Sequence, residues 1–176
     1  MKTEMEQLKS IAKSNSSSTS LDCNNGDFIW KISNFESHLS DARSNLRNTM
    51  YSQAFHSSVP GYKLCVRINL DGVDIRSRNY LSIYIHLMQG DYDDFMEWPF
   101  NRQIKIAIID RNPDQSKRRH IADILKPQSN VTALQRPTEW KSSQGYGFAK
   151  FVSISRLSSR YYVADNKLAI RVQVLS

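Results

Sequence analysis

Histidine and cysteine side chains are the first candidates for catalysis or metal binding in this chain. They are His38, His56, His86, His120, Cys23 and Cys65. No histidine stands at metal-ligand spacing from a cysteine or a second histidine, and Gly-x-Ser-x-Gly, Gly-x-Gly-x-x-Gly and phosphate-loop motifs are absent from the sequence. Cys65 lies inside a strand pattern, which favours a small sheet residue over a nucleophile. The sequence therefore predicts no enzyme, no cofactor and no metal site.

One acidic stretch could in principle hold calcium. Asp91, Asp93, Asp94 and Glu97 surround Tyr92. Their spacing lacks the Asp-x-Asp-x-Asp-Gly order of a calcium loop. We interpret the stretch as a solvated loop.

Basic residues outnumber acidic ones, 24 against 17, so that the formal net charge is +7 and the pI is about 9.5. This balance leaves nucleic acid, an anionic membrane and acidic peptides open as partners. The runs that could meet phosphate are Lys117-Arg118-Arg119 and the pair Arg76/Arg78. Nucleic-acid surfaces also need exposed aromatic rings for stacking, and the aromatic residues here mostly follow the strand pattern into a core. We interpret both runs as a solvated basic rim and expect no nucleic-acid partner.

The length of 176 residues predicts one domain with a core that needs no disulfides. Two cysteines in different contexts favour a reducing compartment, and we expect a cytoplasmic protein. No apolar run approaches the ~20 residues that span a bilayer, and no apolar stretch follows the charged N-terminus. We therefore expect no membrane insertion.

Residues 1–26 differ in composition from the rest. Within 1–13, Met5, Leu8 and Ile11 recur at helical spacing between charged residues, which predicts a short helical stub. Such a helix is too short to be stable alone, so it is either a coiled-coil remnant or a frayed terminus. The Ser- and Asn-rich stretch that follows predicts a flexible linker. The folded domain is expected over residues 27–176.

From residue 27 onward apolar residues alternate with polar ones. The alternating runs are 28–32, 62–70, 81–88, 104–109 and 168–174, with weaker candidates at 50–56 and 146–152. Each predicts a strand with one face in a core and the other in water. Helical signals are confined to Asn34–Asn45, capped by Ser33 or Asn34, and to a turn at 153–159. Many strands with few helices predict an all-β antiparallel sandwich.

Seven segments occur in a characteristic order: Phe28-Ile-Trp-Lys-Ile-Ser-Asn-Phe, Pro60-Gly-Tyr-Lys-Leu-Cys-Val-Arg, Tyr80-Leu-Ser-Ile-Tyr-Ile-His-Leu-Met-Gln-Gly-Asp-Tyr-Asp, Trp98-Pro-Phe, Gln135-Arg-Pro, Gly145-Tyr-Gly-Phe and Tyr162-Val-Ala-Asp-Asn-Lys-Leu. Together they closely resemble the C-terminal domain of the TRAF family (tumour-necrosis-factor-receptor-associated factors), also called the MATH domain. The resemblance covers roughly residues 27–175 and is greatest to the branch of the sixth member, which has Gly-Phe-Gly-Tyr at the sixth segment.

The resemblance implies a sandwich of seven to eight strands that captures short peptides from receptor tails and signalling adaptors. It also implies that the full-length protein is a homotrimer through a preceding coiled coil, which favours the coiled-coil interpretation of Met5, Leu8 and Ile11. An edge strand offers unpaired backbone groups to which an extended peptide can add. Gly145 and Gly147 would permit close approach of such a peptide.

The resemblance assigns a role to further residues. In the sixth-member branch the peptide follows a Pro-x-Glu-x-x-aromatic-or-acidic pattern, and its proline packs on the aromatics matching Tyr146 and Phe148. Its glutamate accepts hydrogen bonds from the amides matching Thr132 and Ala133, a charge-assisted interaction. Its last residue meets the arginine matching Arg67, which could lie over an aromatic ring.

The chain departs from this branch at several places. Ser143 and Gln144 replace Pro-Lys, the loop 126–135 is about two residues longer, and the two aromatics are exchanged. Ser142 and Ser143 could mimic the serines with which other branches bind Ser/Pro-x-Gln-Glu peptides. We expect a non-enzymatic peptide-binding adaptor domain. The alternatives are a MATH substrate adaptor for a ubiquitin ligase or deubiquitinase, and a basic nucleic-acid-binding β domain.

Overall fold

The computed structural model describes residues 25–176, so the helical stub, with Met5, Leu8 and Ile11, and nearly all of the expected linker lie outside the described residues. The strands are β1 (Asp27–Ile32), β2 (Thr49–Tyr51), β3 (Phe55–His56), β4 (Lys63–Asn69), β5 (Tyr80–Met88), β6 (Ile104–Ile108), β7 (Ile121–Leu125), β8 (Tyr146–Ser153), β9 (Val163–Ala164) and β10 (Lys167–Val174). The helices are α2 (Phe35–Arg43) and α3 (Ile154–Leu157), with 3₁₀ turns η1 (Ile75–Ser77), η2 (Asp93–Phe95), η3 (Gln115–Lys117) and η4 (Thr132–Leu134).

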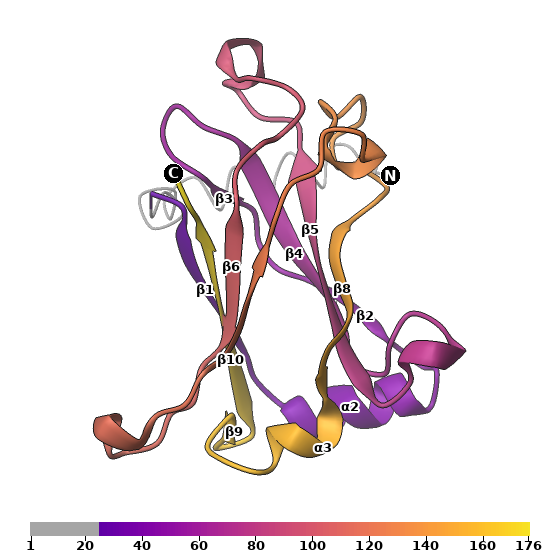
Figure 1. Ribbon diagram of the computed structural model, residues 1–176. Coiled ribbons are helices and arrows are strands. Elements are labelled where there is room, and N and C mark those ends of the chain that lie inside the picture. Colours follow the sequence, from indigo (N-terminus) through magenta and orange to yellow (C-terminus); the bar gives the residue numbers. More distant parts are fainter. Residues whose placement is uncertain (1–24) are drawn as a thin grey trace, which may run out of the picture.

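Two antiparallel sheets face each other and form a sandwich (Figure 1). Sheet A has the order β1-β10-β6-β7 with β9 beside β10, and sheet B has the order β2-β4-β5-β8 with β3 beside β4. The predicted all-β antiparallel sandwich is confirmed. Residues 25–176 contain ten strands instead of the seven or eight expected, because three strands of only two or three residues, β2, β3 and β9, add to the longer ones.

Apolar side chains from the facing sides of the two sheets fill the space between them. They include Leu64, Val66, Ile68, Leu81, Ile83, Leu87, Ile106, Ile108, Leu168, Ile170 and Val172, all at most 2% exposed. The alternation predicted this inner face correctly. It also predicted that the opposite face of every strand meets water, and for sheet B this is wrong, because Cys65, Ser82 and His86 are buried at 3%, 0% and 1% exposure.

The predicted helix over Asn34–Asn45 is α2, two residues shorter at its C-terminal end. Asn34 stands at its N-cap with a positive φ of 55°, and its side chain makes no capping hydrogen bond. The weak strand candidate at 50–56 is split into β2 and β3, which both pair with β4. Strand β7 was not predicted, because only its first and last residues are buried and its pattern shows no alternation.

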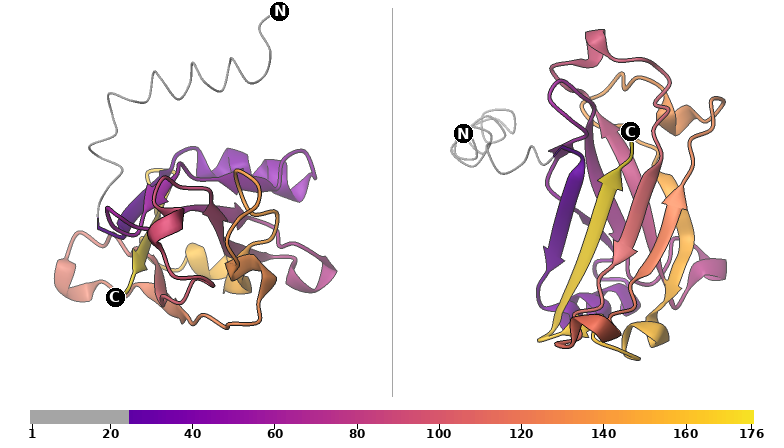
Figure 2. Two further views of the ribbon diagram at one scale, coloured as in Figure 1. Left: turned by 90° about the horizontal axis from the view of Figure 1, so that it is seen from above. Right: turned by 60° about the vertical axis from the view of Figure 1, so that its left-hand side comes forward.

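The two ends of the sandwich differ in what they contain (Figures 1 and 2). The amide of Val174 donates to the carbonyl of Gly26, so the start of β1 and the end of β10 lie together at one end. Helices α2 and α3 and the β6–β7 hairpin lie at the other end (Figure 1). Within residues 25–176 no helix is both long and apolar enough to cross a bilayer.

Candidate functional site

Strand β8 is an edge of sheet B. Among the strands of residues 25–176 it pairs with β5 alone, so its other side carries backbone groups outside the ladder. Between the pairs Leu81–Val152 and Ile83–Phe148, the single residue Ser82 of β5 faces three residues of β8, which makes a bulge. The Ser82 hydroxyl donates to the carbonyl of Ala149 inside it. An open edge strand of this kind is where an added strand can pair.

Tyr146 and Phe148 lie on the core side of β8. They are in register with Ile85 and Ile83, whose side chains fill the inner face of sheet B. Both aromatics are half-buried and pack against the core. Tyr146 donates its hydroxyl to the carbonyl of Lys126, 2.7 Å away, and so links β8 to the segment after β7. These residues are therefore part of the core and part of the surface of the open edge.

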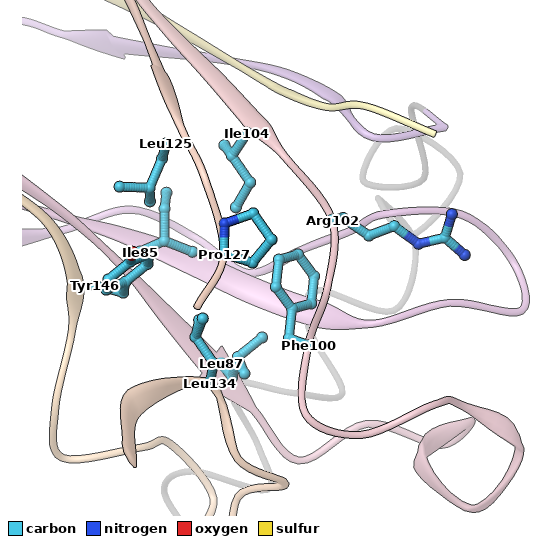
Figure 3. Close-up of a pocket in the computed structure, with 9 residues that line it drawn as sticks. All are labelled: Ile85, Leu87, Phe100, Arg102, Ile104, Leu125, Pro127, Leu134 and Tyr146. Atoms are coloured by element: carbon cyan, nitrogen blue, oxygen red, sulfur yellow. The ribbon is translucent and has the colours of Figure 1, made fainter. Parts of the chain in front are cut away.

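A narrow apolar cavity lies behind Tyr146, between the sheets (Figure 3). Its lining includes Leu87, Phe100 and Leu134, while the guanidinium of Arg102 points away from it. The volume open to water is about 10 Å³, which suffices for one water molecule. The cavity is thus a packing feature, and it makes any truncation of Tyr146 a change in core volume.

Gly145 and Gly147 lie against β5. A Cβ on Gly147 would stand 2.0 Å from the carbonyl oxygen of Ile83, and one on Gly145 would stand 2.7 Å from Nε2 of His86. Both distances are below any real contact, so the pairing of β8 with β5 itself requires glycine at these positions. The structure shows that these glycines make room for β5. That they also make room for a peptide, as the sequence suggested, stays a prediction.

Thr132 and Ala133 begin the 3₁₀ turn η4. The first amides of a helical turn have no acceptor within that turn, so these two N–H groups are donors that it leaves unused. Thr132 is exposed and Ala133 is buried. An open groove of about 210 Å³ adjoins the turn and is lined by Thr132, Gln135, Arg136, Pro137, Thr138, Glu139, Ser142 and Ser143.

Arg67 lies on the outer face of sheet B. Tyr51, Arg67, Tyr84 and Gly147 are cross-strand partners, one on each of β2, β4, β5 and β8. The guanidinium carbon of Arg67 is 4.4 Å from the centre of the Tyr84 ring, as expected for an arginine over an aromatic ring. Its Nε is buried without a hydrogen-bond partner in the described part of the chain.

The predicted residues therefore surround β8 and do not share one face. The aromatics are on the inner side, and Arg67 and Gly147 are in register on the outer side through Tyr84. Gly145 immediately precedes β8, and Thr132 and Ala133 lie on the loop after β7. The sequence missed two residues beside them. His86 is buried against this edge, and Lys141 places its ammonium 3.4 Å from the centre of the Tyr51 ring. The register between strands brings His86 and Lys141 close to the predicted residues. The spacing of residues along the chain does not show this register.

His86 contributes its imidazole to the junction of β5 with the segment before β8. Its Nδ1 lies 2.8 Å from the carbonyl oxygen of Ser142. Because a carbonyl only accepts, Nδ1 carries the proton and Nε2 is the bare nitrogen, which has no partner in the described residues. Burial is the largest cause that lowers the pKa of His86, and the nearby charges of Arg67 and Lys141 lower it further.

Two carboxylates of the acidic stretch 91–97 have partners within the protein. Asp93 is buried, and its Oδ2 accepts from the amide of Gly90 while its carbonyl accepts from the indole N–H of Trp98. Asp94 forms an ion pair with Arg136, at 2.6 Å. Among residues 25–176 no three His, Cys, Asp or Glu side chains are arranged to hold a metal ion.

The chain is similar in sequence and in structure to known proteins. The family model of the TRAF/meprin MATH domain matches residues 47–171. TNF receptor-associated factor 6 of Bos taurus is 34% identical over 151 residues, which are 85% of this chain and 28% of that protein. The same factor of Danio rerio is 30% identical over 150 residues, 85% of this chain and 27% of that protein. The solved structure of Notothenia coriiceps TRAF5 superposes with a TM-score of 0.84 at 26% identity, covering 98% of this chain and 84% of that one. This chain spans little more than a quarter of those two relatives.

Proposed function

The chain belongs to the TRAF/meprin MATH-domain family, and from this premise we propose that it is a signalling adaptor domain that binds short linear peptides in the cytoplasmic tails of receptors or in adaptor proteins. The resemblance to the TRAF family, and to its sixth member, is confirmed by the comparisons. The proposed role is binding and not catalysis. The protein is proposed to act in the cytoplasm.

The open edge of β8 is the observation that carries this proposal. An extended peptide that pairs with this edge gains main-chain hydrogen bonds along its length. Beside that edge stand the half-exposed rings of Tyr146 and Phe148, which offer an apolar contact to a proline. Beyond it stand the unused amides of Thr132 and Ala133.

These groups fit a Pro-x-Glu-x-x-aromatic-or-acidic peptide. The glutamate would accept from the amides of Thr132 and Ala133, which are charge-assisted bonds. The last residue would contact the guanidinium of Arg67, which packs on the ring of Tyr84. We expect a dissociation constant of roughly 1 µM to 1 mM for one short peptide. Trimerisation of the full-length protein, to which Met5, Leu8 and Ile11 would contribute, would then supply avidity.

Substitution of Thr132 by proline tests the amide contacts directly. Thr132 is the first residue of η4, a position that tolerates proline, and Val131 before it has φ −85° and ψ 124°, the extended conformation required before proline. Thr132→Pro therefore removes one N–H donor and preserves the turn. We expect peptide affinity, measured by isothermal titration calorimetry, to fall about tenfold, with unchanged unfolding.

Gln115→Pro is the matched control, because Gln115 is the first residue of η3 and Asp114 before it is likewise extended. It should bind the peptide as the unaltered chain does. Arg67→Ala should lower the affinity for peptides that end in an aromatic or acidic residue and leave the affinity for peptides that end in alanine unchanged. Tyr146→Ala would enlarge the cavity of Figure 3, so Phe148→Leu is the better test of the proline contact. If Thr132→Pro and Arg67→Ala both bind like the unaltered chain, the site is elsewhere.

A further inference from the structure

The end of the sandwich that is remote from Gly26 and Val174 presents aliphatic and cationic side chains together. We call it the distal end, and it comprises α2, the loop 70–79, α3 and the β6–β7 hairpin (Figures 1 and 2). Backbone hydrogen bonds join segments that are neighbours in space around this end. The amide of Ile154 donates to the carbonyl of Asn79, and the amide of Phe35 donates to the carbonyl of Asn166. The amide of Arg111 donates to the carbonyl of Tyr161.

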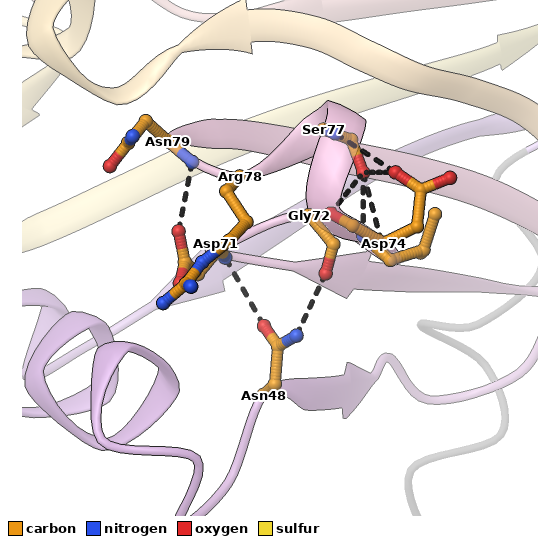
Figure 4. A network of polar contacts seen from close by, with 8 residues as sticks. Asn48, Asp71, Gly72, Asp74, Ser77, Arg78 and Asn79 are labelled. Atoms are coloured by element: carbon orange, nitrogen blue, oxygen red, sulfur yellow. Dashed lines mark hydrogen bonds and ion pairs between the residues drawn. The ribbon is translucent and has the colours of Figure 1, made fainter.

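The loop 70–79 holds an aliphatic side chain out in water. Ile75, on η1, is 88% exposed, and Val73 beside it is 44% exposed. Polar contacts brace the loop beneath them (Figure 4). The Ser77 hydroxyl accepts from the amides of Val73 and Asp74, and the Asp74 carboxylate accepts from the amide of Ser77 at 2.9 Å. The exposed aliphatics are therefore presented by an ordered loop.

A second segment adds to this apolar surface. Asn48 donates to the carbonyl of Gly72 and accepts from the amide of Asp71, so the stretch between α2 and β2 is tied to the loop 70–79 (Figure 4). Leu46, two residues before Asn48, is 78% exposed. Two connected segments at the distal end thus expose large aliphatic side chains that no described residue covers.

Exposed basic groups outnumber exposed carboxylates at this end, where Glu36, Asp74, Asp114 and Asp165 are exposed and two other carboxylates are buried. Asp71 is buried and accepts from the amide of Asn79, and Asp110 is fully buried and accepts from the amides of Asn112 and Arg119. These acidic groups are occupied by backbone donors. Exposed cationic side chains lie on these segments and on the stretch from α3 to the start of β10: Arg76, Arg78, Lys117, Arg119, Arg156, Arg160 and Lys167. Arg78 forms an ion pair with Asp71, and Lys117 forms one with Asp114.

We propose that the distal end docks peripherally on an anionic phospholipid surface. Cations near such a surface each contribute attraction to acidic headgroups, and aliphatic side chains gain by entering the boundary between headgroups and acyl chains. Tyr161, exposed on the loop after α3, is of the type that sits at headgroup level. A nucleic acid would engage the same cations but offers no apolar layer to Ile75 and Val73, and stacking would need more exposed rings than this one.

Vesicle flotation of the full chain tests the proposal. The chain should float with vesicles of phosphatidylcholine and phosphatidylserine, and stay behind with vesicles of phosphatidylcholine alone. Lys117→Glu/Arg119→Glu should lower the partition constant about thirtyfold, and added salt should lower it further. Lys31→Glu/Lys105→Glu makes the same change of charge at exposed positions on the outer face of sheet A and should have less than a tenth of that effect.

The apolar part is tested separately. Ile75→Ser should lower partition about fivefold, whereas Ile29→Ser, at an exposed strand position of sheet A, should leave it unchanged. Equal flotation with both kinds of vesicle, or equal losses in the distal and control variants, would overturn the proposal. So would binding to labelled duplex DNA or single-stranded RNA that exceeds vesicle binding and ignores Ile75→Ser. Peptide binding at β8 is measured without vesicles, so its failure is distinguishable from this one.

Discussion

The outer faces of the two sheets share one sequence pattern but bury different residues. On sheet A the outward positions Ile29, Lys31 and Lys105 are exposed to water, as alternation predicts, and the buried outward positions of the central strands are the small Ala107 and Ala169. On sheet B the corresponding outward positions Cys65 and His86 are buried. Sheet B therefore carries a second, polar layer beside the proposed peptide edge, and sheet A does not.

The segment that precedes β8 pairs with the end of β5 and places the Lys141 side chain on the outer face of sheet B, with its ammonium 3.4 Å from the centre of the Tyr51 ring. The amide of Gln89 donates to the carbonyl of Trp140, and the amide of Ser142 donates to the carbonyl of Leu87, so this segment extends the pairing with β5. The ring of Tyr51 packs edge-on against His86, with 5.6 Å between centroids. Polar residues on a strand therefore mark a solvent-exposed face only where no side chain from another strand or segment packs over them.

The largest expected effect is that of adding a methyl group at Gly147, on the outer face of sheet B. Gly147→Ala puts a Cβ 2.0 Å from the backbone oxygen of Ile83, so β5 and β8 must separate. We expect a loss of about 3 kcal/mol or more in the free energy of unfolding, measured with urea. Ala122→Val adds volume at an exposed position of β7 on sheet A and should change stability by less than about 0.5 kcal/mol. Similar losses of stability in both variants would mean that the outer faces of the two sheets do not differ.

The thiol of Cys65 reports the same contrast by its reactivity. Burial raises its pKa from 9.0 to about 11, so at neutral pH its thiolate fraction is about a hundredfold lower than that of a free thiol. In a Cys23→Ser background, disulfide reagents should label the folded chain at least a hundredfold more slowly than the unfolded chain. Lys105→Cys, in a chain that lacks both native cysteines, should be labelled nearly as fast folded as unfolded. Fast labelling of folded Cys65 would show that the outer face of sheet B is open.

Alternation was sufficient for the inner faces of the longer strands, since each of these strands needs only one apolar side to enter the core, whereas β7 of sheet A shows no alternation and was missed. It could not reveal the burial of Cys65 or His86, because the covering segment comes from residues 140–142, more than fifty positions further along the chain. The role of Gly147 in a peptide site stays a prediction, and its close approach to β5 was not predicted. The distance to Ile83 depends on the register between β5 and β8, which the sequence does not show.

Acid should weaken the buried layer of sheet B. The folded chain lowers the pKa of His86 below its usual value of 6.5, so the unfolded chain binds protons more tightly. Stability is therefore complete above that pH and falls as the pH drops through it, by at most about 1.4 kcal/mol per pH unit. His86→Asn should remove this part of the slope in urea titrations, and His38→Gln should not. An unchanged slope in His86→Asn would place the titration elsewhere.

The smallest effect is expected from the ion pair on the outer face of sheet A. Arg171 donates from Nε and Nη2 to the two carboxylate oxygens of Asp27, at 2.8 and 2.5 Å, and the hydrogen bonds lower the pKa of Asp27. A lowered carboxyl pKa stabilises the fold above the unfolded value of 3.8 and ceases to do so as the pH falls through the folded value. Both side chains are 40% exposed, so water and salt screen the pair. Asp27→Asn should cost less than about 1 kcal/mol in low salt and almost nothing in high salt. A larger loss of stability that does not depend on salt would mean that the outer face of sheet A is also shielded from water. The outer faces of the two sheets would then differ only in the residues they carry.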